Sequence, residues 1–148
     1  MELRAAVGSG PVALDTAPFI YFIEQHPRFG PLVRHLLDDA DRGVRLVVTS
    51  AVTLLEVLVV PYRAGDVTLA ERYEALLTRS RGLRLVGLDR AQLKTAAQIR
   101  AAYRARTPDA LQLAAALTQR CSAFVTDDRA MPAVPGLRIL QLSEYAGQ

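Results

Sequence analysis

Five short apolar segments are spaced along the chain with room for helices between them, and this alternation limits the fold more than any other feature. The segments are 12–14, 45–48, 83–86, 123–125 and 137–140. Because they are mostly apolar throughout, rather than at every second residue, they are typical of strands covered on both faces. Strands that alternate with helices usually pair in parallel. The sequence therefore predicts an α/β fold, a three-layer sandwich with a central, mainly parallel β-sheet flanked by helices.

The segments between these strands carry signals for helix starts. Segments 68–71 and 89–92 each have the spacing of a capping box, with Thr68 and Asp89 as the expected capping residues. Thr107 is expected to cap a further helix, with a proline at its first position and an acid near the positive end of its dipole.

Length and composition predict one globular domain. A chain of 148 residues can bury a proper core, and we expect a single domain over 1–148 with its core at about 12–142. Hydrophobic residues make up 51% and charged residues 22%, which excludes a disordered chain. No uncharged stretch approaches the roughly 20 apolar residues of a membrane-spanning helix, and no export signal is apparent. A single cysteine, Cys121, fits a reducing compartment, so we expect a cytoplasmic protein without a membrane partner.

The basic residues are almost all arginine. Lysine and arginine together number 18 against 15 acidic residues, a formal net charge of +3, and Lys94 is the only lysine. Arginine binds phosphate through paired hydrogen bonds, which allows a nucleic-acid partner. A codon composition that favours arginine explains the same bias, and a net charge of +3 spread along the chain does not decide between them.

Acidic residues stand at four places in the chain that suit a binding site in such a fold. Asp15 and the pair Asp127-Asp128 follow predicted strands, Asp109 lies in the first turn of a helix, and Glu56 lies about six residues into another. Ligand sites of parallel sheets lie at the carboxyl ends of the strands, so we expect these acids near one edge. Each aspartate also has a structural alternative, as a helix cap, a dipole partner or part of a polar turn.

Glu56 is the hardest of the four to explain as structural. The helix around it is apolar on nearly every side, which predicts burial, and an unpaired buried carboxylate costs several kcal/mol. It therefore needs an arginine, a hydrogen-bond network or a metal ion. Four acids near one edge would also repel one another without a counter-charge, and oxygen ligands suit Mg²⁺ or Mn²⁺. Two such ions activate water and stabilise a phosphodiester leaving group, which is nuclease chemistry.

Other chemistries have less support. His26 and His35 have no further histidine or cysteine at zinc spacing, and Cys121 is expected to pack in the core. A phosphatase or receiver-like domain with Asp15 as nucleophile or phosphate acceptor is the rival hydrolase. Phosphatases of that type use a second aspartate two residues later, where this chain has Ala17.

The order and spacing of these motifs resemble those of the PIN-domain ribonucleases, and the chain length and last motif resemble most the VapC-type toxins of bacterial toxin–antitoxin pairs. The resemblance extends from about residue 12 to the final strand. The motifs that carry it are Leu14-Asp15-Thr16 followed by Ile20-Tyr21, Glu56 after Thr49-Ser50, Pro108-Asp109-Ala110 before Leu113-Ala114-Ala115-Ala116, and Thr126-Asp127-Asp128.

The resemblance implies a set of site residues. The acids that match the family's catalytic, metal-binding quartet are Asp15, Glu56, Asp109 and Asp128. Thr126 matches a supporting hydroxyl, whereas Asp127 falls on a variable position and is treated as secondary. Ala17 departs from the asparagine or serine of many members, which removes a hydrogen bond near Asp15 and no expected ligand.

The resemblance also implies an activity and partners. It implies a Mg²⁺- or Mn²⁺-dependent endoribonuclease that cleaves RNA with metal-activated water, acts as the toxin of a type II toxin–antitoxin pair, and is inhibited by a cognate, DNA-binding antitoxin. A homodimer is expected as well. A non-toxin PIN-domain nuclease of RNA processing and a non-catalytic PIN-like binding module remain open as alternatives.

Two further features bear on partners. A group of arginines precedes Asp109 in the sequence: Arg100, Arg104 and Arg106. They either hold the RNA backbone or form a solvated helix face. Segment 54–62 and the stripe at 69, 73, 76 and 77 carry more apolar residues than one sheet face needs. They either complete the core or form a surface for a second copy of the chain or for an antitoxin helix.

Overall fold

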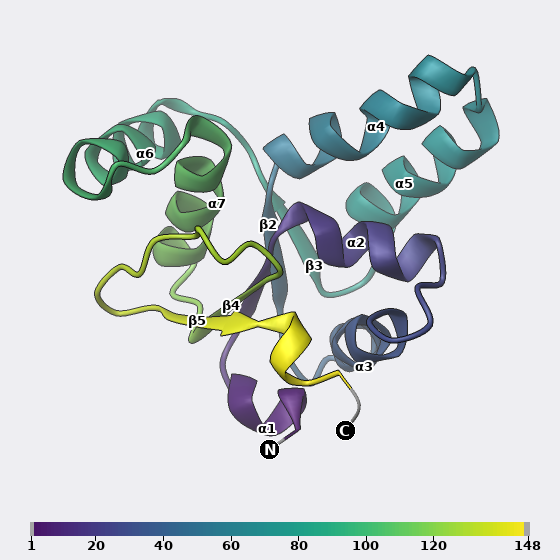
Figure 1. Ribbon diagram of the computed structural model, residues 1–148, viewed down its shortest axis with the longest axis horizontal. Helices are drawn as coiled ribbons and strands as arrows, with labels where there is room; N and C mark the ends of the chain where they lie inside the picture. The colour runs from purple at the N-terminus through teal and green to yellow at the C-terminus, as the bar shows by residue number, and fades with distance from the viewer. Residues whose placement is uncertain (1, 147–148) are drawn as a thin grey trace.

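The computed structural model describes residues 2–146 and contains one five-stranded sheet in the order β3-β2-β1-β4-β5, with every pair parallel (Figure 1). The strands are β1 (Val12–Leu14), β2 (Val47–Ser50), β3 (Leu83–Val86), β4 (Ala123–Thr126) and β5 (Arg138–Gln141). The predicted parallel sheet is confirmed. The second strand lies two residues later than predicted, because Thr49 and Ser50 pair with β3 and so belong to the strand.

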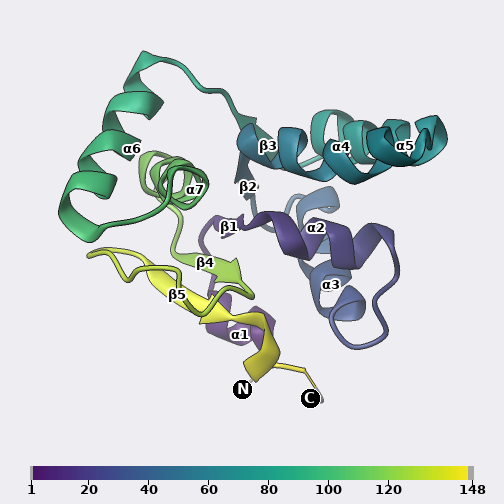
Figure 2. The same cartoon turned by 45° about the horizontal axis from the view of Figure 1, so that its top comes forward.

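Helices cover both faces of this sheet within residues 2–146, as Figure 2 shows. They are α1 (Leu3–Val7), α2 (Thr16–Ile23), α3 (Gly30–Asp41), α4 (Val52–Ala64), α5 (Val67–Arg79), α6 (Arg90–Tyr103) and α7 (Thr107–Thr118), followed by a 3₁₀ turn at Leu142–Glu144. Helices α6 and α7 lie on one face, while α2, α3 and α5 lie on the other. The three-layer α/β architecture expected from the sequence is confirmed.

The central strands bury both faces, which explains their continuous apolar runs. In β1, Ala13 packs into the core beneath α7, while Val12 and Leu14 pack into the core formed with α2 and α3. Three consecutive alanines of α7, residues 114–116, are fully buried, and their small side chains let the helix lie close to β1 and β2. The start of α7 is thereby fixed over the carboxyl edge of the sheet.

Helix α4 is less buried than its sequence predicted. It pairs with α5 as a hairpin that extends from the sheet (Figure 1), so one side of α4 has no neighbour in the described chain. Leu55, Val60 and Tyr62 are 65%, 68% and 62% exposed. The stripe on α5, in contrast, belongs largely to the core, because Tyr73 and Leu77 are buried.

The start of α5 differs from its prediction, whereas that of α6 agrees. The cap of α5 is Asp66, whose Oδ1 accepts the Leu69 amide at 3.0 Å, so Thr68 lies inside the helix and does not cap it. The αL turn at Gly65 ends α4 and brings Asp66, rather than the threonine, to the helix boundary. Asp89 caps α6 as predicted.

An ion cluster around one buried carboxylate lies at the opposite, amino edge of the sheet. The carboxylate of Asp39, 3% exposed, accepts hydrogen bonds from Arg4, Arg42 and Arg45, and so joins α1, α3 and the segment before β2. Part of the arginine excess is therefore structural. No helix within residues 2–146 combines the length and apolarity needed to cross a membrane.

Candidate active site

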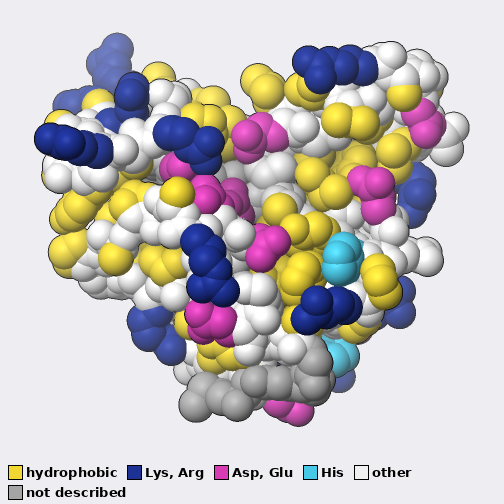
Figure 3. Space-filling model, viewed as in Figure 1, with side chains coloured by type: hydrophobic (Ala, Val, Ile, Leu, Met, Phe, Trp, Pro, Cys, Tyr) yellow, Lys and Arg dark blue, Asp and Glu magenta, His cyan; other side chains and the backbone are white. Residues whose placement is uncertain are grey.

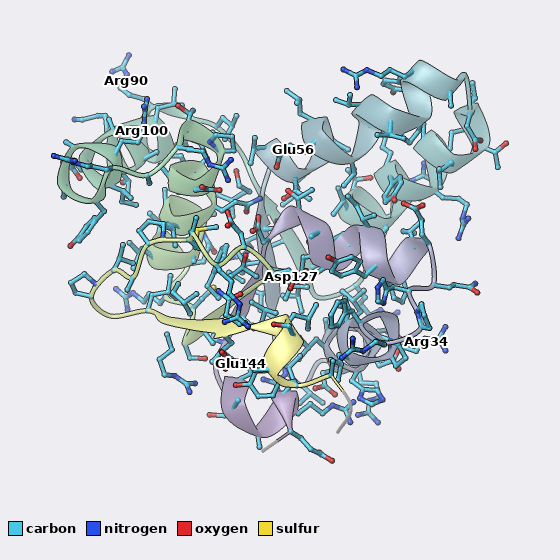
Figure 4. The ribbon with its side chains drawn as sticks, in the orientation of Figure 1. Arg34, Glu56, Arg90, Arg100, Asp127 and Glu144 are labelled. Atoms are coloured by element: carbon cyan, nitrogen blue, oxygen red, sulfur yellow. The ribbon has the colours of Figure 1, made fainter. Side chains whose placement is uncertain are left out.

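The structure places the predicted acids around the carboxyl edge of the sheet. Asp15 follows β1 directly and is the cap residue of α2, and Asp128 comes two residues after β4. Asp109 lies in the first turn of α7, and Glu56 is the fifth residue of α4. Acidic side chains gather in the hollow between the α6–α7 side and the α4–α5 side of the molecule (Figure 3). Figure 4 shows Glu56 at the end of α4 nearest α7.

Asp15 is held in one orientation by two hydrogen bonds. Its Oδ1 accepts the Thr16 amide at 2.8 Å, and its Oδ2 accepts the Thr126 hydroxyl at 2.7 Å. Burial raises the pKa of Asp15, the two hydrogen bonds oppose that rise, and the nearby charges of Asp109 and Glu56 add to it. The Asp15 carboxylate therefore lies in a site where negative charge is unfavourable unless a cation compensates it.

Arg106 supplies such a positive charge within the chain. Its Nε donates to Asp109 Oδ2 at 3.0 Å and its Nη2 donates to Asp128 Oδ2 at 3.0 Å, so one guanidinium joins two of the four acids. The carboxylates of Asp109 and Asp128 in turn raise the pKa of Arg106. The arginine side chain is 72% exposed, so water screens its ion pairs and they add little to the stability of the fold.

The start of α7 differs in detail from its prediction. Thr107 is the first residue of the helix rather than its cap, and Arg106 stands at the cap position without a capping side-chain hydrogen bond. Pro108 at the helix start leaves one amide fewer to cap. The side chain of Arg106 is instead directed to the acids.

The two other predicted RNA-binding arginines do not contact the acids. Arg100 donates through Nε to the Ala105 carbonyl at 3.0 Å, and Arg104 ends α6 with a left-handed backbone, φ 54°. Both are exposed. Figure 4 shows Arg100 on α6, away from Glu56.

Glu56 is half-buried and has a hydrogen-bond network, the second of the three solutions expected for it. Its Oε1 accepts the Thr16 hydroxyl at 2.6 Å, and none of the ion pairs found among the described residues involves it. Asp127 accepts the Tyr21 hydroxyl at 2.6 Å. Burial, together with this hydrogen bond and the charge of Asp127, raises the pKa of Tyr21 to about 12.

Sequence reasoning missed a buried polar group beneath these acids. It consists of Gln112 on α7, Thr49 at the end of β2 and Thr53 on α4, all at most 1% exposed and hydrogen-bonded to one another. The signal that could have found it is Gln112, a single polar residue within the apolar run 110–117, three positions after Asp109. That spacing puts both side chains on one face of α7.

The oxygen atoms that line this site are of the type that binds hard divalent cations. All are carboxylate or hydroxyl oxygens, the ligands that Mg²⁺ and Mn²⁺ prefer. Within residues 2–146, no three acidic, histidine or cysteine side chains converge closely enough to hold a metal ion as they stand. In this conformation Arg106 provides the counter-charge of Asp109 and Asp128, so a bound cation would take over a role that a guanidinium fills here.

The family is shown by comparison with known sequences. The family model described as PIN domain matches residues 12–137, and the chain therefore belongs to the PIN domain family. This confirms the resemblance seen in the motifs. A comparison with curated proteins finds no match.

Solved structures place the fold beside those of toxin–antitoxin proteins. A toxin–antitoxin complex from Klebsiella pneumoniae is similar at 18% identity over 85% of this chain and 94% of that chain, with a TM-score of 0.63. DNA-bound VapBC from Salmonella typhimurium is similar at 23% identity over 89% and 98%, and VapBC2 from Rickettsia felis bound to a promoter fragment at 15% over 88% and 98%, both with TM-scores of 0.60. At these identities the likeness establishes a shared fold.

The raised pKa of Asp15 predicts a pH-dependent stability difference. Below the unfolded-state pKa of 3.8 the carboxyl is protonated in both states, and as the pH rises toward the raised folded-state pKa the unfolded state ionises first, which costs the folded protein stability. Asp15→Asn cannot ionise. In urea unfolding with chelator present, its stability relative to wild type should therefore be greater at pH 7 than at pH 4.

Asp41→Asn, at an exposed position on α3, controls for the loss of one negative charge. A stability difference between Asp15→Asn and wild type that stays constant from pH 4 to pH 7 would contradict the argument from burial.

Proposed function

We propose that this protein is a Mg²⁺- or Mn²⁺-dependent endoribonuclease and the toxin of a type II toxin–antitoxin pair. The observation that carries the proposal is the gathering of the family's four acids at the carboxyl edge of a PIN fold. The charges of Asp109 and Glu56 reach Asp15 there, and Arg106 joins the remaining acid, Asp128, to the group. The similar structures of toxin–antitoxin complexes support the toxin role.

Each acid has a distinct part in the proposed site. Asp15 and Asp109 are the central ligands, and Glu56 and Asp128 complete the site directly or through water. A bound Mg²⁺ or Mn²⁺ supplies the positive charge that activates water and stabilises the leaving oxygen. The protein's own hydroxyls orient the ligands: Thr126 holds Asp15 at 2.7 Å.

RNA is the proposed substrate, bound through its phosphates. Arg100 in the last turn of α6 and Arg104 at its C-cap are exposed and lie within six residues of Arg106, which contacts Asp109 and Asp128. An arginine guanidinium makes paired hydrogen bonds to phosphate oxygens, and these contacts do not distinguish one base from another. Tyr103, 39% exposed in the same turn, offers a ring on which a base can stack.

Loss of one central charge should abolish cleavage. Asp109→Asn keeps the size of the side chain and removes a charge that the cation requires, so RNA cleavage with Mg²⁺ should fall by about 100-fold or more. The assay is cleavage of total bacterial RNA, with fragment ends mapped. Asp41→Asn, on α3, should cleave like wild type. Near-wild-type cleavage by folded Asp109→Asn would remove this residue from the site.

Arg106 should compete with the cation for its ligands. Arg106→Gln removes the guanidinium that joins Asp109 to Asp128, so binding of Mn²⁺, measured by titration calorimetry, should become several-fold tighter. Arg104→Gln, an exposed arginine two residues away, should bind Mn²⁺ like wild type. Equal or weaker binding by Arg106→Gln would show that the guanidinium does not occupy the cation's place.

The exposed side of α4 is the proposed docking surface for an antitoxin helix. Its apolar residues Leu55, Val60 and Tyr62 are each more than 60% exposed and lie on the hairpin beside the acids. A partner bound here would cover the approach of RNA. The homodimer expected from the family would draw on part of the same apolar surface.

Val60→Asp should weaken capture of the product of the adjacent upstream gene by at least about tenfold, because docking would bury the new carboxylate. RNA cleavage should be unchanged. Thr68→Asp, which adds the same charge at an exposed position of α5, is the control. If the upstream product binds both variants equally, the partner lies elsewhere; if size-exclusion chromatography shows that only Val60→Asp loses a dimer, the surface joins two copies.

A further inference from the structure

Gln112 lies at the centre of the buried polar group beneath the acids. It is 1% exposed and stands one helical turn after Asp109. We propose that Gln112 is a positioning residue: its amide fixes the direction of the Thr16 hydroxyl, which in turn orients Glu56. The proposal deepens the proposed nuclease function and rests on it for the catalytic role of Glu56.

The orientation of the Gln112 amide is determined by the backbone. Its Oε1 lies 3.2 Å from the Ser50 amide nitrogen, which can only donate. If the Gln112 amide were flipped, its Nε2 group would face the Ser50 N–H, and two buried donors would lack an acceptor. The Nε2 group therefore points to the other side, where it donates to Thr53 Oγ1 at 2.6 Å and to Thr16 Oγ1 at 3.4 Å.

One branch of the network ends on a carbonyl, which fixes the direction of every hydrogen bond in it. Thr49 donates to the Leu14 carbonyl oxygen at 2.9 Å, which is the nearer of its two acceptors, since Gln112 Oε1 lies 3.4 Å away. Since that hydroxyl has only one proton, Thr49 must accept from Thr53, whose oxygen lies 2.7 Å away. Thr53 in turn must accept from Gln112. This branch connects α7 to Leu14 at the end of β1, the residue immediately before Asp15.

The other branch ends on Glu56. The Thr16 hydroxyl accepts from the Gln112 amide, and its single proton goes to Glu56 Oε1 at 2.6 Å, which is much nearer than Thr53 Oγ1 at 3.4 Å. The carboxylate of Glu56 is thus held as an acceptor at one fixed oxygen. Groups that hold a metal ligand in this way commonly affect metal affinity about 10- to 100-fold. Gln112 does not touch Glu56 itself and affects it through the Thr16 hydroxyl.

A purely structural role makes a different prediction, and the chain contains a matched case. Gln92 on α6 is also buried, at 7% exposed, and its Nε2 donates to Thr118 Oγ1 on α7 at 2.7 Å. This hydrogen bond joins two helices and makes no contact with the acids. Gln92→Leu therefore reports what the loss of a buried amide does to stability alone.

The experiment compares Gln112→Leu with Gln92→Leu in the full chain. Relative to wild type, Gln112→Leu should bind Mn²⁺ about tenfold more weakly and lower kcat with little change in KM, since the arginines that meet the RNA are untouched. Gln92→Leu should lower the melting temperature but keep Mn²⁺ affinity and kcat within about twofold of wild type. Equal Mn²⁺ affinity in the two variants would reduce Gln112 to a structural residue.

Variants of Thr16 test whether the effect of Gln112 passes through the Thr16 hydroxyl. They also keep the proposal testable if Gln112→Leu does not fold. Thr16→Val removes the hydroxyl from a half-buried site, whereas Thr16→Ser keeps it and should retain wild-type Mn²⁺ affinity. If Gln112 acts through this hydroxyl, the double variant Thr16→Val/Gln112→Leu should bind Mn²⁺ no more weakly than Thr16→Val alone. Additive losses would show that Gln112 does not act through Thr16.

A metal-free measurement separates this proposal from the proposed function. The carboxyl ¹³C chemical shift of Glu56, followed by NMR with chelator, should move in both Gln112→Leu and Thr16→Val and stay unchanged in Gln92→Leu. If it stays unchanged in Gln112→Leu, the positioning role is wrong whatever the protein cleaves. If it moves while the wild type neither binds Mn²⁺ nor cleaves RNA, the nuclease function fails and the positioning of Glu56 stands.

Discussion

The close approach of α7 to the sheet is the contact on which the rest of the structure depends. Buried alanines among residues 114–116 allow it, because larger side chains on the face of α7 turned toward β1 and β2 would hold the helix away from them. Because the helix lies so close, Asp109 in its first turn reaches the acids at the strand ends, and Gln112 one turn later reaches the Ser50 backbone. The same contact thus sets both the acids and the polar group beneath them.

The negative charge of the acids in the site is partly compensated in this structure by the guanidinium of Arg106. Burial makes ionisation of Asp15 unfavourable, and its neighbours in the hollow are acids as well. Arg106 meets two of them from an exposed position, at a modest cost in side-chain freedom. An exposed ion pair of this kind is worth little in stability, so a cation that prefers oxygen ligands can replace it.

The sequence predicted the parts of this molecule that follow from burial. Strands covered on both faces must be apolar throughout, so the order of the strands along the chain and the edge occupied by Asp15 and Asp128 could be deduced, although β2 begins two residues later than predicted. Side-chain directions could not. Nothing near Arg106 in the sequence shows that its guanidinium meets Asp128, 22 residues away. Gln112 looks like an isolated exception in an apolar helix, because its partners come from β2 and α4. The surroundings of Glu56 were misjudged, since the apolar pattern of α4 does not reveal that one side lacks a neighbour.

The order of the strands has a consequence for synthesis of the protein. Strand β1 lies at the centre of the sheet, between β2, which follows it closely in the chain, and β4, which begins more than a hundred residues later. A growing chain can pair β1 with β2, and β2 with β3, early, but the other edge of β1 stays open until residues 123–126 leave the ribosome. Asp128 and the Thr126 hydroxyl that holds Asp15 arrive in that same last step. A nascent chain that lacks β4 therefore carries no complete candidate site, because Asp15 is without its Thr126 partner and Asp128 is absent.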